Sequence, residues 1–300
     1  MNLSALHSTF KGQILLNEPL SNHTWLKIGG PADLFLVPSS KDDVVHAISF
    51  CTNHSLPFTI LGSGSNVLVG DKGIRGAVIA LHKTLDYMNV DGSKVRAGAG
   101  ILLPKLVLDL LKEGFTGMEG LGGIPGTLGG AIIMNAGAYG TEIFEFVTDV
   151  ELIRDGEVYT LSRDQIHYTY RATDLNNDII LEVGFEFERG DVEIAKERRK
   201  ELLAKRKNSQ PLDRPNAGSI FKNPDGDYAG RLIEVSGLKG TRVGDAVVSE
   251  KHANFLVNDG NATASDMMAL IKLVQDKVKA DHHQELELEI KLLGEGFYHG

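Results

Sequence analysis

The sequence predicts an α+β protein in which a glycine-rich first part of about 190 residues precedes a second part of about 110. Three observations predict this. Strand and helix patterns follow one another along the first part, and the pattern changes at Gly190, where a charged helix begins. The third observation is glycine usage, because 18 of the 34 glycines lie between Gly62 and Gly140. Glycine costs backbone entropy in ordinary helices and strands, so this concentration predicts a backbone that comes very close to something.

Composition narrows the class of protein. The 300 residues include 31 Lys+Arg and 40 Asp+Glu, a net charge of −9, which argues against a general nucleic-acid binder. The single cysteine, Cys51, allows no intrachain disulfide and favours a reducing, cytoplasmic setting. No basic stretch followed by an apolar run is visible at the N-terminus, so no export signal is expected. Residues 120–141 carry no charge, but their eight glycines and Pro125 predict a buried cofactor-lining loop rather than a membrane span.

The first part contains regular strand, helix and turn signals. Ser39 or Ser40 is a suitable cap for a helix that carries Val44, Ile48 and Cys51. Asp91-Gly92 and Asp155-Gly156 each predict a tight hairpin. Pro104 opens a helix at 105–113, which Gly114 ends. Strands are expected at 33–38, 57–61, 76–81 and 178–188.

The second part begins with the charged helix at 191–209, whose acidic residues come early and basic residues late, as the helix dipole favours. Most of these charges are expected on a solvated face. Ser265 is expected to cap a helix that carries Leu270, Ile271, Val274 and Val278. The alternation from Leu286 to Leu292 predicts a strand with Leu286, Leu288, Ile290 and Leu292 on one face.

Two glycine-rich segments carry the chemistry. In residues 62–66, Gly-Ser-Gly-Ser-Asn, a strand feeds a turn whose backbone N–H groups suit a diphosphate. The segment is neither a Walker loop nor a Rossmann fingerprint, and a tight structural turn is the alternative. In residues 120–140, glycines surround Pro125, and Gly129-Gly130 is a candidate start for a helix whose N-terminus faces a phosphate. A glycine-rich buried turn is the alternative there, but two such segments together favour a large dinucleotide.

At these residues the sequence resembles the UDP-N-acetylenolpyruvoylglucosamine reductases, flavoenzymes of the peptidoglycan precursor pathway. The resemblance spans roughly Thr24 to Gly294, follows the shorter form of the family, and departs modestly at Thr173 and Lys291. The matching motifs are G-S-G-S-N at 62–66, G-I-P-G-T-L-G-G at 123–130, N-A-G-A-Y-G at 135–140, Y-R at 170–171, A-G-S-I-F-K-N-P at 217–224, H-A-N-F at 252–255 and L-E-L-E-I-K at 286–291.

The resemblance implies an FAD-binding domain of the vanillyl-alcohol-oxidase (PCMH) type and a smaller C-terminal α+β substrate-binding domain. The expected boundaries are 1–190, with subdomains at about 1–60 and 61–190, and 191–300, with the last strand returning to the first subdomain. FAD is expected to bind non-covalently. The expected FAD-binding residues are Gly62, Ser63, Gly64, Ser65, Asn66, Gly122, Gly123, Ile124, Pro125, Gly126, Thr127, Gly129, Gly130, Asn135, Gly137 and Ala138.

The resemblance also implies the reaction. NADPH reduces FAD, and the flavin passes hydride to the enolpyruvyl ether of UDP-N-acetylglucosamine enolpyruvate, which gives UDP-N-acetylmuramate. Negative charge that develops beside the substrate carboxylate needs donors and a proton source. By resemblance, Arg171 and Glu289 flank that carboxyl group and Ser219 donates the proton. Glu289 helps only if it is protonated or orients another donor. The expected substrate-binding residues are Tyr170, Arg206, Lys222, Asn223 and Asn254.

Two other functions are weighed. An FAD-dependent oxidase of the same fold class often attaches its flavin through histidine, and neither glycine-rich segment contains one. A nucleotide-sugar-binding module without redox activity would not need the glycine-rich segments. No metal site is expected, since the histidines are scattered. We expect no nucleic-acid or membrane partner, a monomer or weak oligomer, and a cytoplasmic role in cell-wall biogenesis, cell shape and cell division.

Overall fold

The computed structural model describes residues 4–298 and divides into two compact units. Unit 1 comprises residues 1–15, 34–63 and 76–205, and unit 2 comprises residues 16–33, 64–75 and 206–300. Each unit has its own hydrophobic core. This division differs from the expected boundary near residue 190, because two early segments pack with the C-terminal third of the chain.

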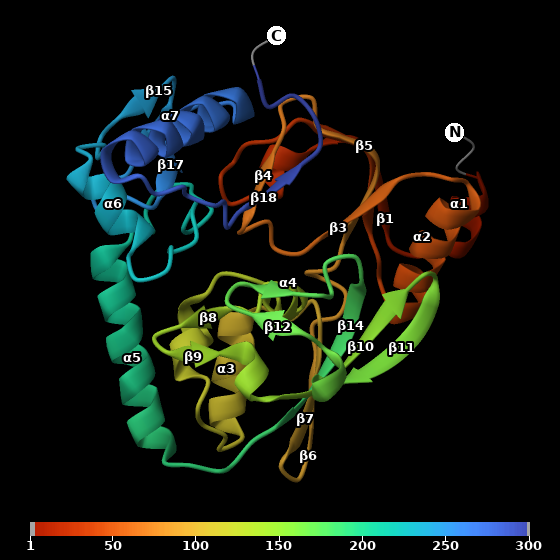
Figure 1. The fold of residues 1–300 in the computed structure, drawn as a ribbon. Coiled ribbons are helices and arrows are strands. Elements are labelled where there is room, and N and C mark those ends of the chain that lie inside the picture. Colours follow the sequence, from red (N-terminus) through yellow and green to blue (C-terminus); the bar gives the residue numbers. More distant parts are fainter. Residues whose placement is uncertain (1–3, 299–300) are drawn as a thin grey trace. The chain divides into compact units, whose positions relative to one another are not determined.

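Unit 1 is built on a five-stranded antiparallel sheet of order β11-β10-β14-β7-β6 (Figure 1). Helix α4 packs against β14 and β7 of this sheet. A four-stranded sheet has the order β1-β2-β5-β3, and the unit boundaries fall inside β1, β2 and β5. The helices are α1 (Ser4–Thr9), α2 (Lys41–Asn53), α3 (Leu103–Lys112), α4 (Leu128–Ile133) and α5 (Val192–Ser209), which ends in unit 2. The strands are β1 (Gln13–Pro19), β2 (Pro31–Val37), β3 (Phe58–Leu61), β5 (Ile74–Ala80), β6 (Met88–Asp91), β7 (Lys94–Gly98), β8 (Gly137–Ala138), β9 (Thr141–Glu142), β10 (Val147–Arg154), β11 (Glu157–Ser162), β12 (Tyr168–Thr169), β13 (Ala172–Thr173) and β14 (Ile179–Glu186).

The local signals of the first part are confirmed. Ser40 caps α2 and accepts a hydrogen bond from the Asp43 backbone N–H at 3.1 Å. Both predicted hairpins form, β6–β7 and β10–β11, and α3 stops just before Gly114. Residues 120–141 form a short 3-10 helix (Glu119–Gly123), then α4 and β8. Among residues 4–298, no helix combines the length and apolar character needed to cross a bilayer.

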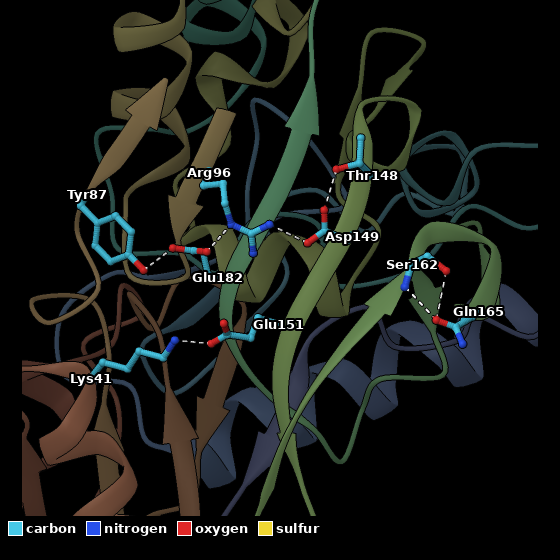
Figure 2. Close-up of polar contacts among 9 residues, drawn as sticks. All are labelled: Lys41, Tyr87, Arg96, Thr148, Asp149, Glu151, Ser162, Gln165 and Glu182. Carbon is cyan, nitrogen blue, oxygen red and sulfur yellow. Dashed lines mark hydrogen bonds and ion pairs between the residues drawn. The ribbon is translucent and has the colours of Figure 1, made fainter. Parts of the chain in front are cut away.

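One face of the five-stranded sheet carries a network of charged side chains (Figure 2). Arg96 on β7 donates to Glu182 on β14 and to Asp149 on β10, the latter at 2.8 Å. The Tyr87 hydroxyl donates to the second oxygen of Glu182 at 2.7 Å. Burial acts to raise the pKa of Glu182, but the hydrogen bonds from Tyr87 and Arg96 outweigh it and hold the pKa below its usual value.

Unit 2 gathers two helices and two small sheets around a second core. Helix α7 packs against α6, β15 and β16, and buries Leu270, Ile271, Val274 and Val278 as predicted. The three-stranded sheet has the order β15-β16-β17, and β18 runs parallel to β4. The elements are α6 (Ala229–Val235), α7 (Ala264–His282), β4 (Val67–Val69), β15 (Arg242–Val243), β16 (Ala246–Val248), β17 (Leu256–Asn258) and β18 (Lys291–Leu293).

The start of α7 corrects one expectation. The N-cap is Thr263, which forms a capping box with Asp266, and Ser265 lies inside the first turn. Ser265 instead donates its hydroxyl to Asp71 at 2.8 Å, and the Asp71 carboxylate also accepts the N–H groups of Ala264 at 2.7 Å and Ser265 at 3.0 Å. Asp71 therefore satisfies N–H groups that the first turn of any helix leaves without a partner, and it does so from a distant chain segment.

The C-terminal alternation is also corrected. Only Lys291–Leu293 forms a strand, while Leu288 makes an isolated bridge to Phe221. Leu286 and Ile290 are buried, but Leu292 is 38% exposed. The predicted common face breaks because the segment changes partner. It lies beside Phe221 up to residue 289 and beside β4 from residue 291 onward.

The charged network predicts how stability depends on pH. Because the folded state keeps Glu182 ionised to lower pH than the unfolded chain does, the contribution is complete above about pH 4.3 and is lost as pH falls through the lowered pKa. Glu182→Gln should therefore lower the free energy of unfolding by about 1 kcal/mol at pH 7, and the difference from the parent should shrink in acid. Denaturant titrations at several pH values measure this.

Glu193→Gln is the control, since the Glu193 side chain is 84% exposed on α5. It should change the free energy of unfolding little at any pH. A gap between the parent and Glu182→Gln that stays constant down to pH 3.5 would contradict the prediction.

Candidate active site

The two glycine-rich segments meet within unit 1. The Ser63 hydroxyl donates to the Pro125 carbonyl at 3.1 Å. A Cβ atom at Gly62 would lie only 2.4 Å from Thr127 Oγ1, so this approach requires glycine. Two of the segments predicted to line FAD are therefore in direct contact.

The first backbone N–H groups of α4 have hydrogen-bond partners within the protein. Leu128 N–H donates to the Ile101 carbonyl at 2.9 Å and Gly129 N–H to the Ala99 carbonyl at 2.8 Å. These two groups are therefore not the phosphate donors that the sequence suggested. Gly130 is different, because it is exposed and a Cβ there would meet only Thr127 Oγ1, at an ordinary 3.5 Å. Packing within the described protein does not explain glycine at position 130.

Asn135 is completely buried just after α4. Its Nδ2 donates to Glu142 Oε2 at 2.8 Å and to the Thr169 carbonyl at 3.0 Å. Within residues 4–298, its buried Oδ1 has no hydrogen-bond partner. A buried acceptor without a donor is costly and calls for a ligand or water. Close-packed bare backbone and this acceptor together fit an extended cofactor with N–H donors, such as FAD.

Arg171 lies in a two-residue turn, Tyr170-Arg171, between β12 and β13. Its backbone is left-handed, with φ of 58°. The guanidinium donates to the Gly137 carbonyl at 2.6 Å and lies 4.8 Å from the centre of the Tyr170 ring. Thr173 Oγ1 donates to the Ile133 carbonyl at 2.9 Å and so holds the hairpin against α4. Although threonine departs from the family motif at this position, it keeps the hydroxyl group that makes this bond. The turn thus places Arg171 beside Gly137, in the second glycine-rich segment.

Arg199 lies beside a predicted FAD segment, a position that the sequence analysis missed. It belongs to α5, whose charges were assigned mostly to a solvated face. Its Nε is buried without a hydrogen-bond partner in the described chain, and a Cβ atom at Gly122 would lie 2.9 Å from it. The sequence signal was Ala195, a small apolar residue within a charged helix, because a residue four positions later lies on the same helix face. The structure buries Ala195.

In unit 2, Asn66 contacts the segment that contains Glu289. Asn66 Nδ2 donates to the Glu289 carbonyl at 3.2 Å, and the Lys291 N–H donates to the Asn66 carbonyl at 3.0 Å. Gly64, with φ of 67°, leaves no room for a side chain, since a Cβ would lie 2.0 Å from the His23 carbonyl oxygen. Asn66 was predicted to bind FAD, and the structure gives its amide a contact with Glu289.

Ser219 and Glu289 lie on neighbouring segments of unit 2. Glu289 N–H donates to the Ile220 carbonyl at 2.8 Å, and Lys222 N–H donates to the Glu287 carbonyl at 2.9 Å. The Lys222 ammonium also lies 3.5 Å from the Glu287 carboxylate. Two of the three predicted catalytic residues are therefore brought together by backbone pairing, whereas Arg171 belongs to unit 1.

The remaining predicted substrate residues have distinct positions. Tyr170 is 46% exposed, and Arg206 lies in the last turn of α5. Asn223 Oδ1 accepts the Ala229 N–H at the start of α6 at 3.1 Å. Asn254 is only 3% exposed, and both polar atoms of its amide bind the Phe221 backbone, which is not the position of a substrate ligand. Within residues 4–298, no three His, Cys, Asp or Glu side chains gather as a metal site.

Comparisons with known proteins match both halves of the chain. Residues 32–162 match an FAD binding domain, and residues 210–293 match the C-terminal domain of UDP-N-acetylenolpyruvoylglucosamine reductase. The reductases of that name from Chloroherpeton thalassium and Moorella thermoacetica are 46% and 44% identical, covering 98% and 99% of this chain and 97% and 100% of their own. The crystal structure of the Thermus caldophilus enzyme superposes with a TM-score of 0.81 at 35% identity, covering 95% of this chain and 99% of that one. The predicted fold class is confirmed.

Substitution of two glycines distinguishes close packing within the protein, at Gly62, from space left for a cofactor, at Gly130. Gly62→Ala should cost about 1–3 kcal/mol of stability, because the new Cβ overlaps Thr127. Gly130→Ala should fold as the parent does, since its Cβ has room in the protein, but should bind FAD more weakly. Denaturant titration measures the first effect and flavin fluorescence titration the second.

The opposite pattern would contradict this assignment. Unchanged FAD affinity in Gly130→Ala would mean that no ligand approaches that glycine. Gly156→Ala is the control, because Gly156 lies in the β10–β11 turn with open space around it, and its φ of 85° strains alanine there without touching the glycine-rich segments. It should leave FAD affinity unchanged.

Proposed function

The chain belongs to the UDP-N-acetylenolpyruvoylglucosamine reductase family, and from this premise we propose how its residues perform the reaction. It is an FAD-dependent oxidoreductase that forms UDP-N-acetylmuramate for peptidoglycan synthesis. The proposal takes NADPH as the reductant and Ser219 as the proton donor. The observation that carries it is the backbone pairing of the Ser219 and Glu289 segments next to Asn66.

The FAD site is proposed on the two glycine-rich segments and Asn135. When bound, FAD carries the two electrons of the reduction from NADPH to the alkene of the enolpyruvyl group. Gly130 exposes backbone to the cofactor, whereas Gly62 lets the two segments close on each other, and Asn135 Oδ1 accepts one of the cofactor's N–H donors. The Arg199 guanidinium beside Gly122 offers a positive charge to the cofactor phosphates.

Arg171 is proposed to bind the substrate carboxylate. Reduction of the alkene places negative charge on the carbon beside that carboxylate, and a guanidinium fits a planar carboxylate with two parallel hydrogen bonds. The left-handed backbone at Arg171, which seven other non-glycine residues of the described chain share, costs about 1–3 kcal/mol. The Gly137 carbonyl and Tyr170 ring then fix the guanidinium in place.

Ser219 is proposed to give its proton to the carbon that becomes negative. A serine hydroxyl is a poor acid in water, so the transfer needs nearby polarising groups, and Lys222 lies three residues away on the same segment. Glu289 is proposed to act on the carboxyl group, either in its protonated form or by orienting another donor. Tyr170, Lys222, Asn223 and Arg206 are proposed to hold the rest of the sugar nucleotide.

The cellular setting is proposed as the cytoplasm. The single cysteine, Cys51, is buried, and burial raises the pKa of its thiol to about 11, so it stays a protonated, unreactive thiol. A monomer or weak oligomer stays a prediction.

Ser219→Ala tests the assigned proton donor. NADPH should reduce the flavin at the parent rate, because that step needs no proton from Ser219. Reoxidation by the enolpyruvyl substrate should fall by at least about a hundredfold, as for loss of a general acid. Anaerobic stopped-flow absorbance of the flavin separates the two steps. Equal loss in both steps would remove Ser219 from this role.

Arg171→Lys tests the carboxylate contact, because lysine keeps the charge but not the two parallel donors. Reoxidation by substrate should slow by about 10²–10³-fold, as for loss of a donor to a developing anion, with flavin reduction unchanged. Arg163→Lys is the matched control, since Arg163 precedes the same hairpin and donates to Tyr168. If that variant slows reoxidation as much, the Arg171 effect reflects the hairpin's fold.

A further inference from the structure

Asn254 binds residues 220 and 221, which follow Ser219, through three of its polar atoms. Its Oδ1 accepts the Phe221 N–H at 3.0 Å, and its Nδ2 donates to the Phe221 carbonyl at 2.8 Å. Its own backbone carbonyl accepts the Ile220 N–H at 2.9 Å. A single amide side chain thus pairs with Phe221 as a neighbouring strand would.

The opposite edge of the same segment pairs with the Glu289 segment. Ile220 and Lys222 bond to Glu289 and Glu287 through backbone groups, and the Asn66 amide donates to the Glu289 carbonyl. Residues 220–222 therefore lie between Asn254 on one edge and residues 287–289 on the other. Gly218, with φ of 77°, makes the turn that leads into Ser219, and its N–H donates to Asn216 Oδ1 at 2.9 Å. On the other side of Ser219, the bonds at residues 220–221 fix where the chain continues.

We propose that Asn254 is a positioning residue that sets Ser219 relative to Glu289 by holding the Phe221 backbone. This inference rests on the proposed function, in which Ser219 donates the proton. Asn254 touches neither substrate nor cofactor in this assignment. Its effect passes through two backbone hydrogen bonds, so a small shift of residues 220–221 moves the Ser219 hydroxyl away from the carbon it must protonate.

Asn254→Asp tests the proposal with a pH signature. A protonated carboxyl group accepts from Phe221 N–H and donates to the Phe221 carbonyl, as the amide does. An ionised carboxylate has no donor and faces that carbonyl oxygen with a negative charge. The rate of flavin reoxidation by substrate, divided by the parent rate at the same pH, should therefore be about 10- to 100-fold below one at alkaline pH and recover toward one in acid. The reduction of flavin by NADPH should match the parent throughout.

Asn258→Asp is the matched control. Asn258 is 4% exposed in unit 2, and its amide likewise donates to one carbonyl, that of Leu26 at 3.0 Å, and accepts the N–H groups of Gly260 and Ala262. Asn258→Asp should also lose stability as pH rises, because it too replaces a buried amide donor with a carboxylate. Its reoxidation rate relative to the parent should not change with pH. Thermal melts alongside the rates separate stability from positioning.

The double variant Ser219→Ala with Asn254→Asp completes the test. If Asn254 acts through Ser219, the second change should slow reoxidation by less than about twofold beyond Ser219→Ala alone. A flat ratio in Asn254→Asp, an equal slope in Asn258→Asp, or fully additive losses would each overturn the proposal. Parent-like reoxidation by Ser219→Ala would instead overturn the proton-donor assignment. A pH-dependent loss of reoxidation in Asn254→Asp would then be assigned to displacement of Glu289.

Discussion

Unit 2 depends on hydrogen bonds between chain segments that are far apart in sequence. The Asp71 carboxylate binds the first turn of α7 across 193 positions, and β18 pairs with β4. The N–H groups at a helix start must find partners, and a carboxylate also complements the helix dipole there. Through these bonds the C-terminal third of the chain pairs with residues 64–75, which lie far from it in sequence. Asn66 follows the same rule, because its contact with Glu289 depends on β4 lying beside β18.

Backbone hydrogen bonds, more than contacts between side chains, set the predicted catalytic groups in place. Arg171 lies in a hairpin turn whose strands are tied to the end of α4, by Thr173 to Ile133 and by the side chain of Asn135 to Thr169. Ser219 and Glu289 are set by a short paired segment, and Asn254 completes the pairing where a third strand is missing. Amide side chains suit this use, since one amide carries both a donor and an acceptor and holds no charge in the buried protein.

Local signals in the sequence predicted local structure well, but they did not predict pairing between segments far apart in the sequence. The Ser40 cap and the Asp91-Gly92 and Asp155-Gly156 hairpins depend on a few neighbouring residues, so their patterns were sufficient. Ser265 and the Leu286–Leu292 alternation failed because Asp71 and Phe221, remote in sequence, decide their surroundings. The glycine excess was interpreted correctly as close approach, but at Gly62 and Gly64 the close partner is the protein itself. The site residues came from motif resemblance, and the contacts of Asn254 and Arg199 needed coordinates.

Because unit 2 consists of three separate chain segments, it cannot fold until the last of them has been synthesised. Residues 16–33 and 64–75 are synthesised well before residue 206, and the intervening residues take on the order of ten seconds to translate. During that interval Leu26, Ile28 and Leu68, which later join the second core, have no core to enter. Unit 1 can form most of its five-stranded sheet in the same interval, because that sheet is complete by residue 186. The order of synthesis therefore favours unit 1 folding first, with nascent apolar segments of unit 2 as natural clients for chaperones.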